Sequence, residues 1–194
     1  MQQIVNFILE LDKLKGVTRK TRPLGLDRYE NSAEHSWQLA MLAASAAQFA
    51  AEPVDADRVI RMLLVHDIGE IDTGDTMVYV QGGWEERHQA ELAAVTRIFG
   101  MLPKERGEEF LSLWIEFNEG KTAESKFAQA VDRAMPVLLN LANNGQSWRE
   151  NGIAYERVIA RIEGQIRTGC PALWEYLQAE LKRAHENGWF GTLG

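Results

Sequence analysis

The 194-residue chain has little of several features that mark particular protein classes. Its single cysteine, Cys170, excludes an internal disulfide framework and any zinc site built from thiolates. The sequence has no run of eighteen uncharged apolar residues, and its first helix-like segment carries Glu10 and Asp12 without a small-residue cleavage site. We therefore expect a cytoplasmic protein with no membrane partner, in which any metal is held by histidine and carboxylate side chains.

Positive charge is also scarce, since 21 lysines and arginines face 28 acidic residues and the net charge is −7. A surface that binds a nucleic-acid polymer needs a broad excess of cations, so we expect no such partner. The cations gather in one segment, "KLKGVTRKTRPLGLDR" at 13–28, where six of them face only Asp27. An ordinary solvated loop is the simpler interpretation of this segment, and a site for a small anion such as phosphate is the alternative.

What is abundant is helical periodicity, and strand-like alternation is rare. Hydrophobic residues make up 45% and charged residues 25% of the chain, as is typical of soluble globular proteins. We predict an all-α protein with one domain over residues 1–194. The expected helices lie at about 2–14, 31–50, 56–67, 84–99, 104–118, 122–143, 154–167 and 172–186.

Local signals refine these helices. Asn31 followed by Glu34 resembles a capping box, and Asp55 can cap the helix that stops near Gly69. In the first helix Ile4, Ile8, Leu11 and Leu14 share one side, which predicts its buried face. The segment "ALWEYLQAEL" (172–181) offers an apolar face near the C-terminus, from which we expect a homodimer. Irregular structure is expected at 16–31 and 69–83.

The first candidates for metal-binding or catalytic residues are the histidines that lie beside acids. Taken singly, His35, His66 and His88 are each more often surface or core residues than metal ligands. His66 and Asp67 are adjacent, and neighbours on a regular helix point about 100° apart, so they can share a metal only where the helix ends. Gly69 permits such an end. We interpret His88 as structural and His185 as a surface residue near a frayed helix end.

Asp132 is an acid beside an apolar stripe that includes Val131 and Met135. A buried acid must be paired, hydrogen-bonded or bound to a metal. Asp132 can therefore be a metal ligand, or it can lie at the edge of the stripe and pair with Arg133 or a neighbouring helix.

The segments "AEHSW" (33–37), "HDIGE" (66–70), "TGD" (73–75) and "DR" (132–133) resemble, in order and spacing, the HD-domain metal-dependent phosphohydrolases. The closer resemblance is to the branch that contains bacterial 5′-deoxynucleotidases and the eukaryotic HD-domain-containing protein 2. It covers about residues 5–145, with C-terminal helices at about 150–187 expected to pack on that part. The resemblance implies an HD-type helical bundle whose metal ligands are His35, His66, Asp67 and Asp132. Such a mixed nitrogen and oxygen site accepts Mn²⁺, Co²⁺, Mg²⁺, Fe²⁺ or Zn²⁺.

The same resemblance implies that Glu70 and Asp75 are the catalytic acids, with their individual roles left open. Asp72 falls outside the family pattern, and we interpret it as a loop or turn residue.

For the phosphate, Arg19 is the first candidate and Arg28 the second, because a planar guanidinium can bind two oxygens at once. Trp37 can stack on a base or sugar, or it can belong to the core. In the deoxynucleotidase branch a tryptophan that senses the sugar follows the arginine, whereas Lys20 follows Arg19 here. A preference for deoxyribose is therefore not carried over.

The resemblance implies a phosphohydrolase that removes phosphate from nucleoside 5′-monophosphates with a metal-activated water. Two alternatives remain open. The first is an HD hydrolase of a phosphodiester or a guanosine polyphosphate, and the second is a non-catalytic regulatory protein that binds metal and nucleotide.

Overall fold

The computed structural model describes residues 1–77 and 83–191. Part of the irregular segment predicted at 69–83 thus lies outside the described residues. The expectation of an all-α protein is confirmed, since the described ranges contain helices and a single β-bridge between Thr18 and Asn31 but no strand. In chain order the elements are α1 (Gln2–Leu11), the 3₁₀ helix η1 (Asp12–Gly16), α2 (Ser32–Ala46), η2 (Ala47–Phe49), α3 (Ala56–Val65), α4 (Glu70–Thr73), α5 (Trp84–Phe99), α6 (Lys104–Glu119), α7 (Ala123–Ala142), α8 (Gln146–Glu150), α9 (Tyr155–Gly169) and α10 (Pro171–Glu186).

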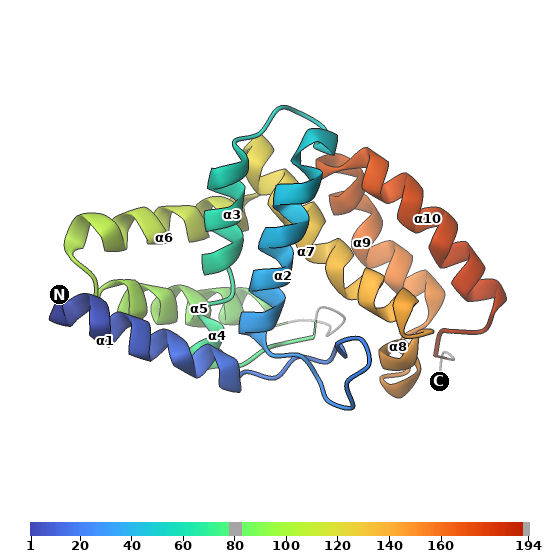
Figure 1. Ribbon diagram of the computed structural model, residues 1–194, viewed down its shortest axis with the longest axis horizontal. Helices are drawn as coiled ribbons and strands as arrows, with labels where there is room; N and C mark the ends of the chain where they lie inside the picture. The colour runs from blue at the N-terminus through green and yellow to red at the C-terminus, as the bar shows by residue number, and fades with distance from the viewer. Residues whose placement is uncertain (78–82, 192–194) are drawn as a thin grey trace.

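Helix α7 lies between two groups of helices and belongs to both (Figure 1). On one side it packs with α2, α3 and α6, where Leu63, Trp114 and Val131 belong to one continuous buried cluster. On the other side it packs with α9 and α10 around a second cluster, which includes Ala134 and Ile162. The C-terminal helices therefore pack on the part of the chain that carries the sequence motifs.

The predicted N-caps are present. Asn31 and Glu34 form the capping box at the start of α2: the Asn31 side chain accepts from the Glu34 N–H, and the Glu34 carboxylate accepts from the Asn31 N–H. Asp55 caps α3 through the Arg58 N–H. Helix α3 ends at Val65, two residues earlier than predicted, and short turns lead from there to α4. These caps fix where the chain enters the two helices that carry the histidines.

The predicted buried face of the first helix is right at Leu11 and Leu14 and wrong at Ile4 and Ile8. Leu14 is buried and Leu11 is partly buried, whereas Ile4 and Ile8 are exposed and Phe7 is buried instead. Phe7 contacts the rings of Phe99 and Phe110, so the helix is rotated to bring its aromatic residue inward. An aromatic side chain buries more apolar area than an isoleucine, which favours this orientation.

The apolar face of α10 is not available for a partner. Trp174, Leu177 and Leu181 are buried in the second cluster against α7 and α9, and Tyr176 is exposed on the other side. The sequence feature from which a homodimer was expected is therefore part of the chain's own core. Short helix α8, which the sequence did not predict, adds Trp148 to the same cluster.

Among the helices that the structure describes, none is both long enough and apolar enough to span a membrane.

Candidate functional site

The end of α3 turns His66 and Asp67 toward each other. His66 follows the last helical residue, and its Nδ1 lies 2.8 Å from the carbonyl oxygen of Leu63. A carbonyl can only accept, so Nδ1 carries a proton, and Nε2 is the ring nitrogen that can take a second proton or a metal ion. That Nε2 lies 3.1 Å from Oδ1 of Asp67. The helix therefore ends where these neighbours lie, which is the condition under which they could share a metal.

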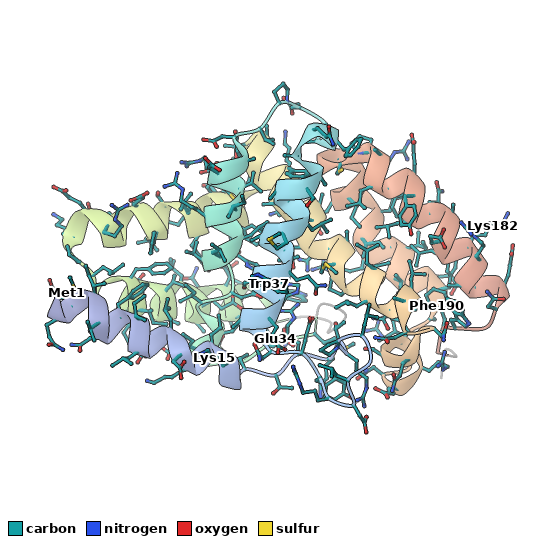
Figure 2. All side chains as sticks on the ribbon, in the orientation of Figure 1. Met1, Lys15, Glu34, Trp37, Lys182 and Phe190 are labelled. Atoms are coloured by element: carbon teal, nitrogen blue, oxygen red, sulfur yellow. The ribbon has the colours of Figure 1, made fainter. Side chains whose placement is uncertain are left out.

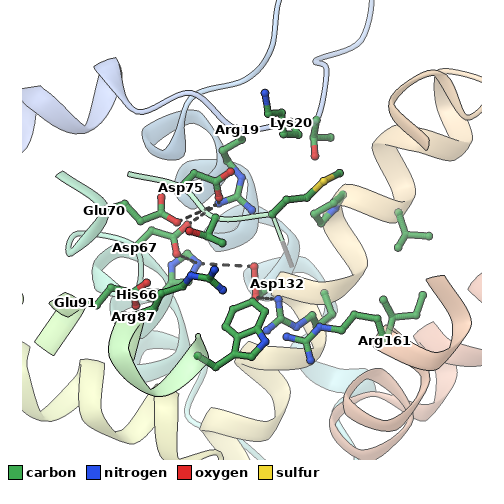
Figure 3. A pocket seen from close by; sticks show the side chains of 18 of the residues that line it. Arg19, Lys20, His66, Asp67, Glu70, Asp75, Arg87, Glu91, Asp132 and Arg161 are labelled. Carbon is green, nitrogen blue, oxygen red and sulfur yellow. Dashed lines mark hydrogen bonds and ion pairs between the residues drawn. The ribbon is translucent and has the colours of Figure 1, made fainter. Parts of the chain in front are cut away.

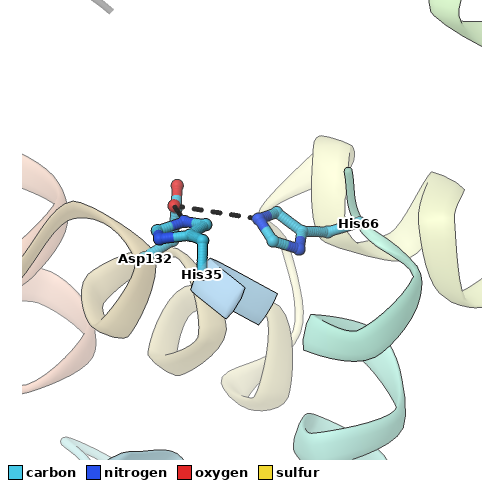
Figure 4. A group of neighbouring side chains, drawn as sticks. All are labelled: His35, His66 and Asp132. Carbon is cyan, nitrogen blue, oxygen red and sulfur yellow. Dashed lines mark hydrogen bonds and ion pairs between the residues drawn. The ribbon is translucent and has the colours of Figure 1, made fainter. Parts of the chain in front are cut away.

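Helices α2 and α7 add a second histidine and a second carboxylate. His35 is in the first turn of α2, and its Nε2 lies 3.1 Å from Oδ1 of Asp132 on α7. The same oxygen is 3.8 Å from Nε2 of His66, and one donor atom from each of the three side chains lies within 4.8 Å of the others (Figure 4). The other Asp132 oxygen is 3.5 Å from Arg133, so this acid pairs with its neighbour while its first oxygen faces both histidines.

Three of these side chains, His35, His66 and Asp132, lie close enough together to hold a divalent metal ion, and Asp67 adjoins them through His66. Nε2 of His66 is buried and makes no well-directed hydrogen bond to a described residue, although carboxylates flank it. Two imidazole nitrogens and two carboxylates form a donor set suited to first-row divalent ions, and a buried ring nitrogen flanked by carboxylates favours a positive charge there, either a proton or a metal ion. Three elements far apart in sequence, α2, the α3–α4 junction and α7, thus supply one possible metal site.

The pKa values of the two histidines move in opposite directions. Burial, together with the positive charge of Arg19, lowers the pKa of His35 to about 4. Burial also opposes a charge on His66, but the negative charges of Asp67 and Asp132 outweigh it and raise its pKa to about 10. The carboxylates that favour a proton at this position favour a divalent cation for the same reason.

Two more acids, Glu70 and Asp75, lie beside these side chains; the resemblance implies that they are the catalytic acids. Glu70 begins the single turn α4, rather than lying beyond a helix end, and its carboxylate accepts from the Ser32 hydroxyl at 2.6 Å. Gly74 has a φ of +74°, a conformation that a side chain would strain, and it turns Asp75 back toward the site. Burial, followed by the charge of Asp67, raises the pKa of Glu70 well above its ordinary value, and burial also raises that of Asp75.

Arg19 is the cation that joins these acids (Figure 3). Its Nη1 donates to Asp67 at 2.9 Å and lies 3.5 Å from Asp75 and 3.9 Å from Glu70. The charge of Arg19, after that of His66, holds the pKa of Asp67 at about 2 although burial would raise it. The first candidate for phosphate binding therefore lies at the centre of the acid cluster.

A cavity of about 430 Å³ opens on this cluster. The acids of the α3–α4 junction and Arg19 form one part of its lining, and α5, α6, α7, α8 and α9 supply the rest. This remaining lining is rich in cations and aromatic rings, among them Trp84, Arg87, Arg133 and Arg161. Arg87 and Arg161 both lie over the indole ring of Trp84, 5.1 and 5.4 Å from its centre.

Three of the residues weighed from the sequence lie outside this cavity. Arg28 is exposed and forms two hydrogen bonds with the Glu34 carboxylate, at 2.6 and 2.8 Å, so its guanidinium is committed to the helix cap. Trp37 is 64% exposed on α2, which contradicts the alternative of core packing (Figure 2). Asp72, interpreted as a loop or turn residue, lies in the single helical turn α4, and its carboxylate pairs with Arg97, away from the cavity.

The other two histidines have ordinary surroundings. His88 stacks on Trp114 at 5.4 Å, although it also borders the cavity. His185 is exposed and stacks on Tyr155.

Sequence reasoning missed several residues of the site. Ser32 and Glu30 stand directly before the first histidine, in the segment "ENSAEH", but nothing in their spacing marks them. Glu30 is buried beside Arg19, and burial raises its pKa to about 7 against the opposing charge of Arg19. Trp84, Arg87 and Arg161 come from helices that carry no recognisable motif, so only the packing of α5 and α9 brings them to the cavity.

Curated relatives match this chain over about two thirds of its length or slightly more. The 5′-deoxynucleotidase HDDC2 of Xenopus laevis is 29% identical over 136 residues, which cover 68% of this chain and 66% of that protein. Its human counterpart is 28% identical over 138 residues, covering 71% and 66%. The chain thus spans just under two thirds of the length of these curated relatives.

Two solved structures are similar over almost the whole chain. A predicted metal-dependent phosphohydrolase from Magnetospirillum magnetotacticum MS-1 has a TM-score of 0.91 and 36% identity, with 98% of this chain and 97% of that chain covered. The PH0347 protein of Pyrococcus horikoshii OT3 has a TM-score of 0.63 at 22% identity, with coverages of 94% and 98%, and shows the shared fold alone.

A family model of the HD domain matches residues 11–174. Because this match spans most of the sequence, and a 36% identical relative matches nearly end to end, the chain belongs to the HD-domain family.

Proposed function

We propose that the protein is a metal-dependent phosphohydrolase that removes phosphate from nucleoside 5′-monophosphates. The observation that carries the proposal is the convergence, at one cavity, of a histidine and carboxylate donor set, two further buried acids and an arginine. The names of the HDDC2 relatives and of the Magnetospirillum protein support this reaction class.

The cavity supports a small-molecule substrate. Its volume of about 430 Å³ falls within the range of ordinary ligand pockets, which extends over roughly 300–1,000 Å³. One side offers Arg19 for a phosphate group, and the other offers Trp84 and cationic side chains for the rest of the molecule. A phosphomonoester that carries an aromatic base matches this division.

In the proposed reaction His35, His66, Asp67 and Asp132 hold a divalent ion. When bound, the ion supplies Lewis-acid chemistry, lowering the pKa of a water and polarising the phosphate oxygens. Arg19 neutralises charge that spreads over the equatorial oxygens of the phosphoryl group. Glu70 and Asp75, both buried at the cavity, handle the protons: one accepts from the attacking water, and the other serves the leaving oxygen.

The direct test is phosphate release from ribo- and deoxyribonucleoside 5′-monophosphates with Mn²⁺, Co²⁺ or Mg²⁺. In Glu70→Gln we expect kcat to fall by about 10²- to 10⁴-fold while the bound metal is retained, because only a proton-transfer group is lost. Glu108→Gln is the matched control, since Glu108 is an exposed glutamate on α6 that pairs with Lys104 at the protein surface. Turnover of Glu70→Gln at the wild-type rate would show that its assigned role is wrong.

The same assay separates the alternatives that the sequence leaves open. A phosphodiester and a guanosine polyphosphate belong in the panel, and turnover of these alone would move the protein to another HD activity. Tight nucleotide binding by calorimetry, with no phosphate released from any compound, would instead favour a regulatory protein.

A further inference from the structure

Glu30 has no assigned part in the proposed reaction. The backbone nevertheless holds it beside Arg19 and His35, which both have assigned parts. The Arg19 N–H donates to the Glu30 carbonyl at 2.9 Å, and the Glu30 N–H donates to the Thr21 carbonyl at 2.9 Å. This antiparallel pairing leads directly into α2, whose first turn carries His35. The Glu30 side chain is thus held at a set position relative to both Arg19 and His35.

Three buried atoms without a hydrogen bond converge at this carboxylate. Oε1 of Glu30 lies 3.5 Å from Nε of Arg19 and 3.7 Å from Nδ1 of His35. None of the three makes a hydrogen bond to another described residue. Buried polar atoms are nearly always paired, and here one carboxylate oxygen faces the Nε–H of Arg19 and a ring nitrogen of His35 that carries the proton when Nε2 binds a metal. A movement of roughly half an ångström would bring the histidine nitrogen within hydrogen-bond distance.

His66 shows the effect of placing a hydrogen-bond acceptor beside Nδ1 of a histidine. On His66, the Leu63 carbonyl accepts from Nδ1–H, so that Nε2 faces Asp67. On His35, Nε2 faces Asp132, and Glu30 lies on the Nδ1 side. Glu30 therefore occupies the position at His35 that a backbone carbonyl occupies at His66. Metal-binding histidines generally donate their second ring N–H to such an acceptor, which fixes the tautomer and the ring orientation.

We propose that Glu30 is a positioning residue that holds His35 and Arg19 together. It accepts from Nδ1–H of His35, which leaves Nε2 available to the metal, and it accepts from Nε–H of Arg19, which keeps the terminal nitrogens directed at the cavity. The inference rests on the proposed function, because it takes His35 as a metal ligand and Arg19 as the phosphate-binding residue.

The test is calorimetric titration of Mn²⁺ into metal-stripped wild-type protein and three variants. Glu30→Ala is expected to bind Mn²⁺ about 10- to 100-fold more weakly, the usual cost of losing an outer-shell partner. Glu30→Gln should lie between this variant and wild type, because its amide oxygen can still accept one hydrogen bond. Glu34→Gln is the matched control: it removes the same charge from the same segment, but its partners are Arg28 and Asn31. Circular dichroism confirms that each variant is folded.

A second measurement needs no variant. In Zn²⁺-loaded wild-type protein with ¹⁵N-labelled histidine, the Nδ1 proton of His35 should be shifted downfield and exchange slowly. Solvent-like exchange of that proton would overturn the inference, even if Glu30→Ala failed to fold.

The outcomes separate the two proposals. Mn²⁺ affinities within twofold of wild type in both Glu30 variants would overturn the positioning role, whatever the turnover. Weakened affinity in both, with no phosphomonoester hydrolysed by wild type, would support the positioning role and overturn the proposed function. A wild-type protein that binds no Mn²⁺ would overturn both.

Discussion

Two segments meet at the cavity, residues 17–31 and 66–75. Both contribute side chains to it, but different backbone hydrogen bonds hold them in place. The second is a compact series of turns, held by hydrogen bonds between residues three or four apart, such as Glu70 N–H to the Asp67 carbonyl. The first is held by pairing between residues about eleven apart, such as Arg19 with Glu30. Side-chain directions are therefore set locally in 66–75, but by a longer-range pairing in 17–31.

This difference explains which charged side chains reach the site. In 66–75 the carboxylates of Asp67, Glu70 and Asp75 face the cavity, and Asp72 faces Arg97. In 17–31 the guanidinium of Arg19 faces the cavity, whereas that of Arg28 faces Glu34. Each segment thus contains two residues of the same type that can be compared, one at the site and one away from it: Asp67 and Asp72 in the second segment, and Arg19 and Arg28 in the first.

The largest expected effect distinguishes Asp67 from Asp72. Asp67→Asn removes a proposed ligand, so its loss of Mn²⁺ affinity should exceed the about 10- to 100-fold cost of an outer-shell change. Asp72→Asn should leave metal affinity unchanged and lower the free energy of unfolding by less than about 1 kcal/mol, because its pair with Arg97 is partly exposed. Calorimetry and urea denaturation measure the two quantities. Equal metal affinities in the two variants would contradict the assignment of Asp67.

A smaller effect distinguishes Arg19 from Arg28. Arg19→Lys keeps the charge but loses the planar arrangement of donors, so KM for a phosphomonoester should rise roughly 10- to 100-fold, the equivalent of one charged hydrogen bond. Arg28→Lys should leave KM within twofold of wild type, because Arg28 binds the helix cap. Steady-state kinetics at saturating metal gives both values. If Arg28→Lys raised KM as much as Arg19→Lys, phosphate binding would belong to the whole loop.

The smallest expected effect concerns the pH dependence of metal binding, which follows from the raised pKa of His66. The pKa of His66 is raised to about 10, so the stability it contributes without metal is complete below pH 6.5 and is lost as the pH rises toward 10. If His66 is a metal ligand, as proposed, Mn²⁺ must displace this proton, so its affinity should rise with pH. The increase in Tm on adding Mn²⁺ should therefore be larger at pH 8.5 than at pH 6.0. Equal increases in a thermal-shift assay, each measured against EDTA, would argue that His66 is neutral before metal binds.

Much of the fold could be predicted because its signals are local. Helix periodicity and the caps at Asn31 and Asp55 depend on residues within one or two turns, and the structure agrees with them. Where burial depends on what packs against a helix, prediction was less successful: Phe7 is buried rather than Ile4, and the apolar face of α10 is internal. Periodicity reveals that a face exists but not what covers it.

The sequence by itself determined the all-α class, the order of the helices, and which histidines and acids are spaced as an HD-family set. Tertiary structure alone decided that Arg19 enters the site while Arg28 does not, that Trp37 lies outside the cavity, and that Glu30 stands behind His35. The physical reason is the range of the interactions. Helices and caps are encoded by neighbours in the chain, whereas the direction of a loop side chain follows from contacts between segments that meet only after folding.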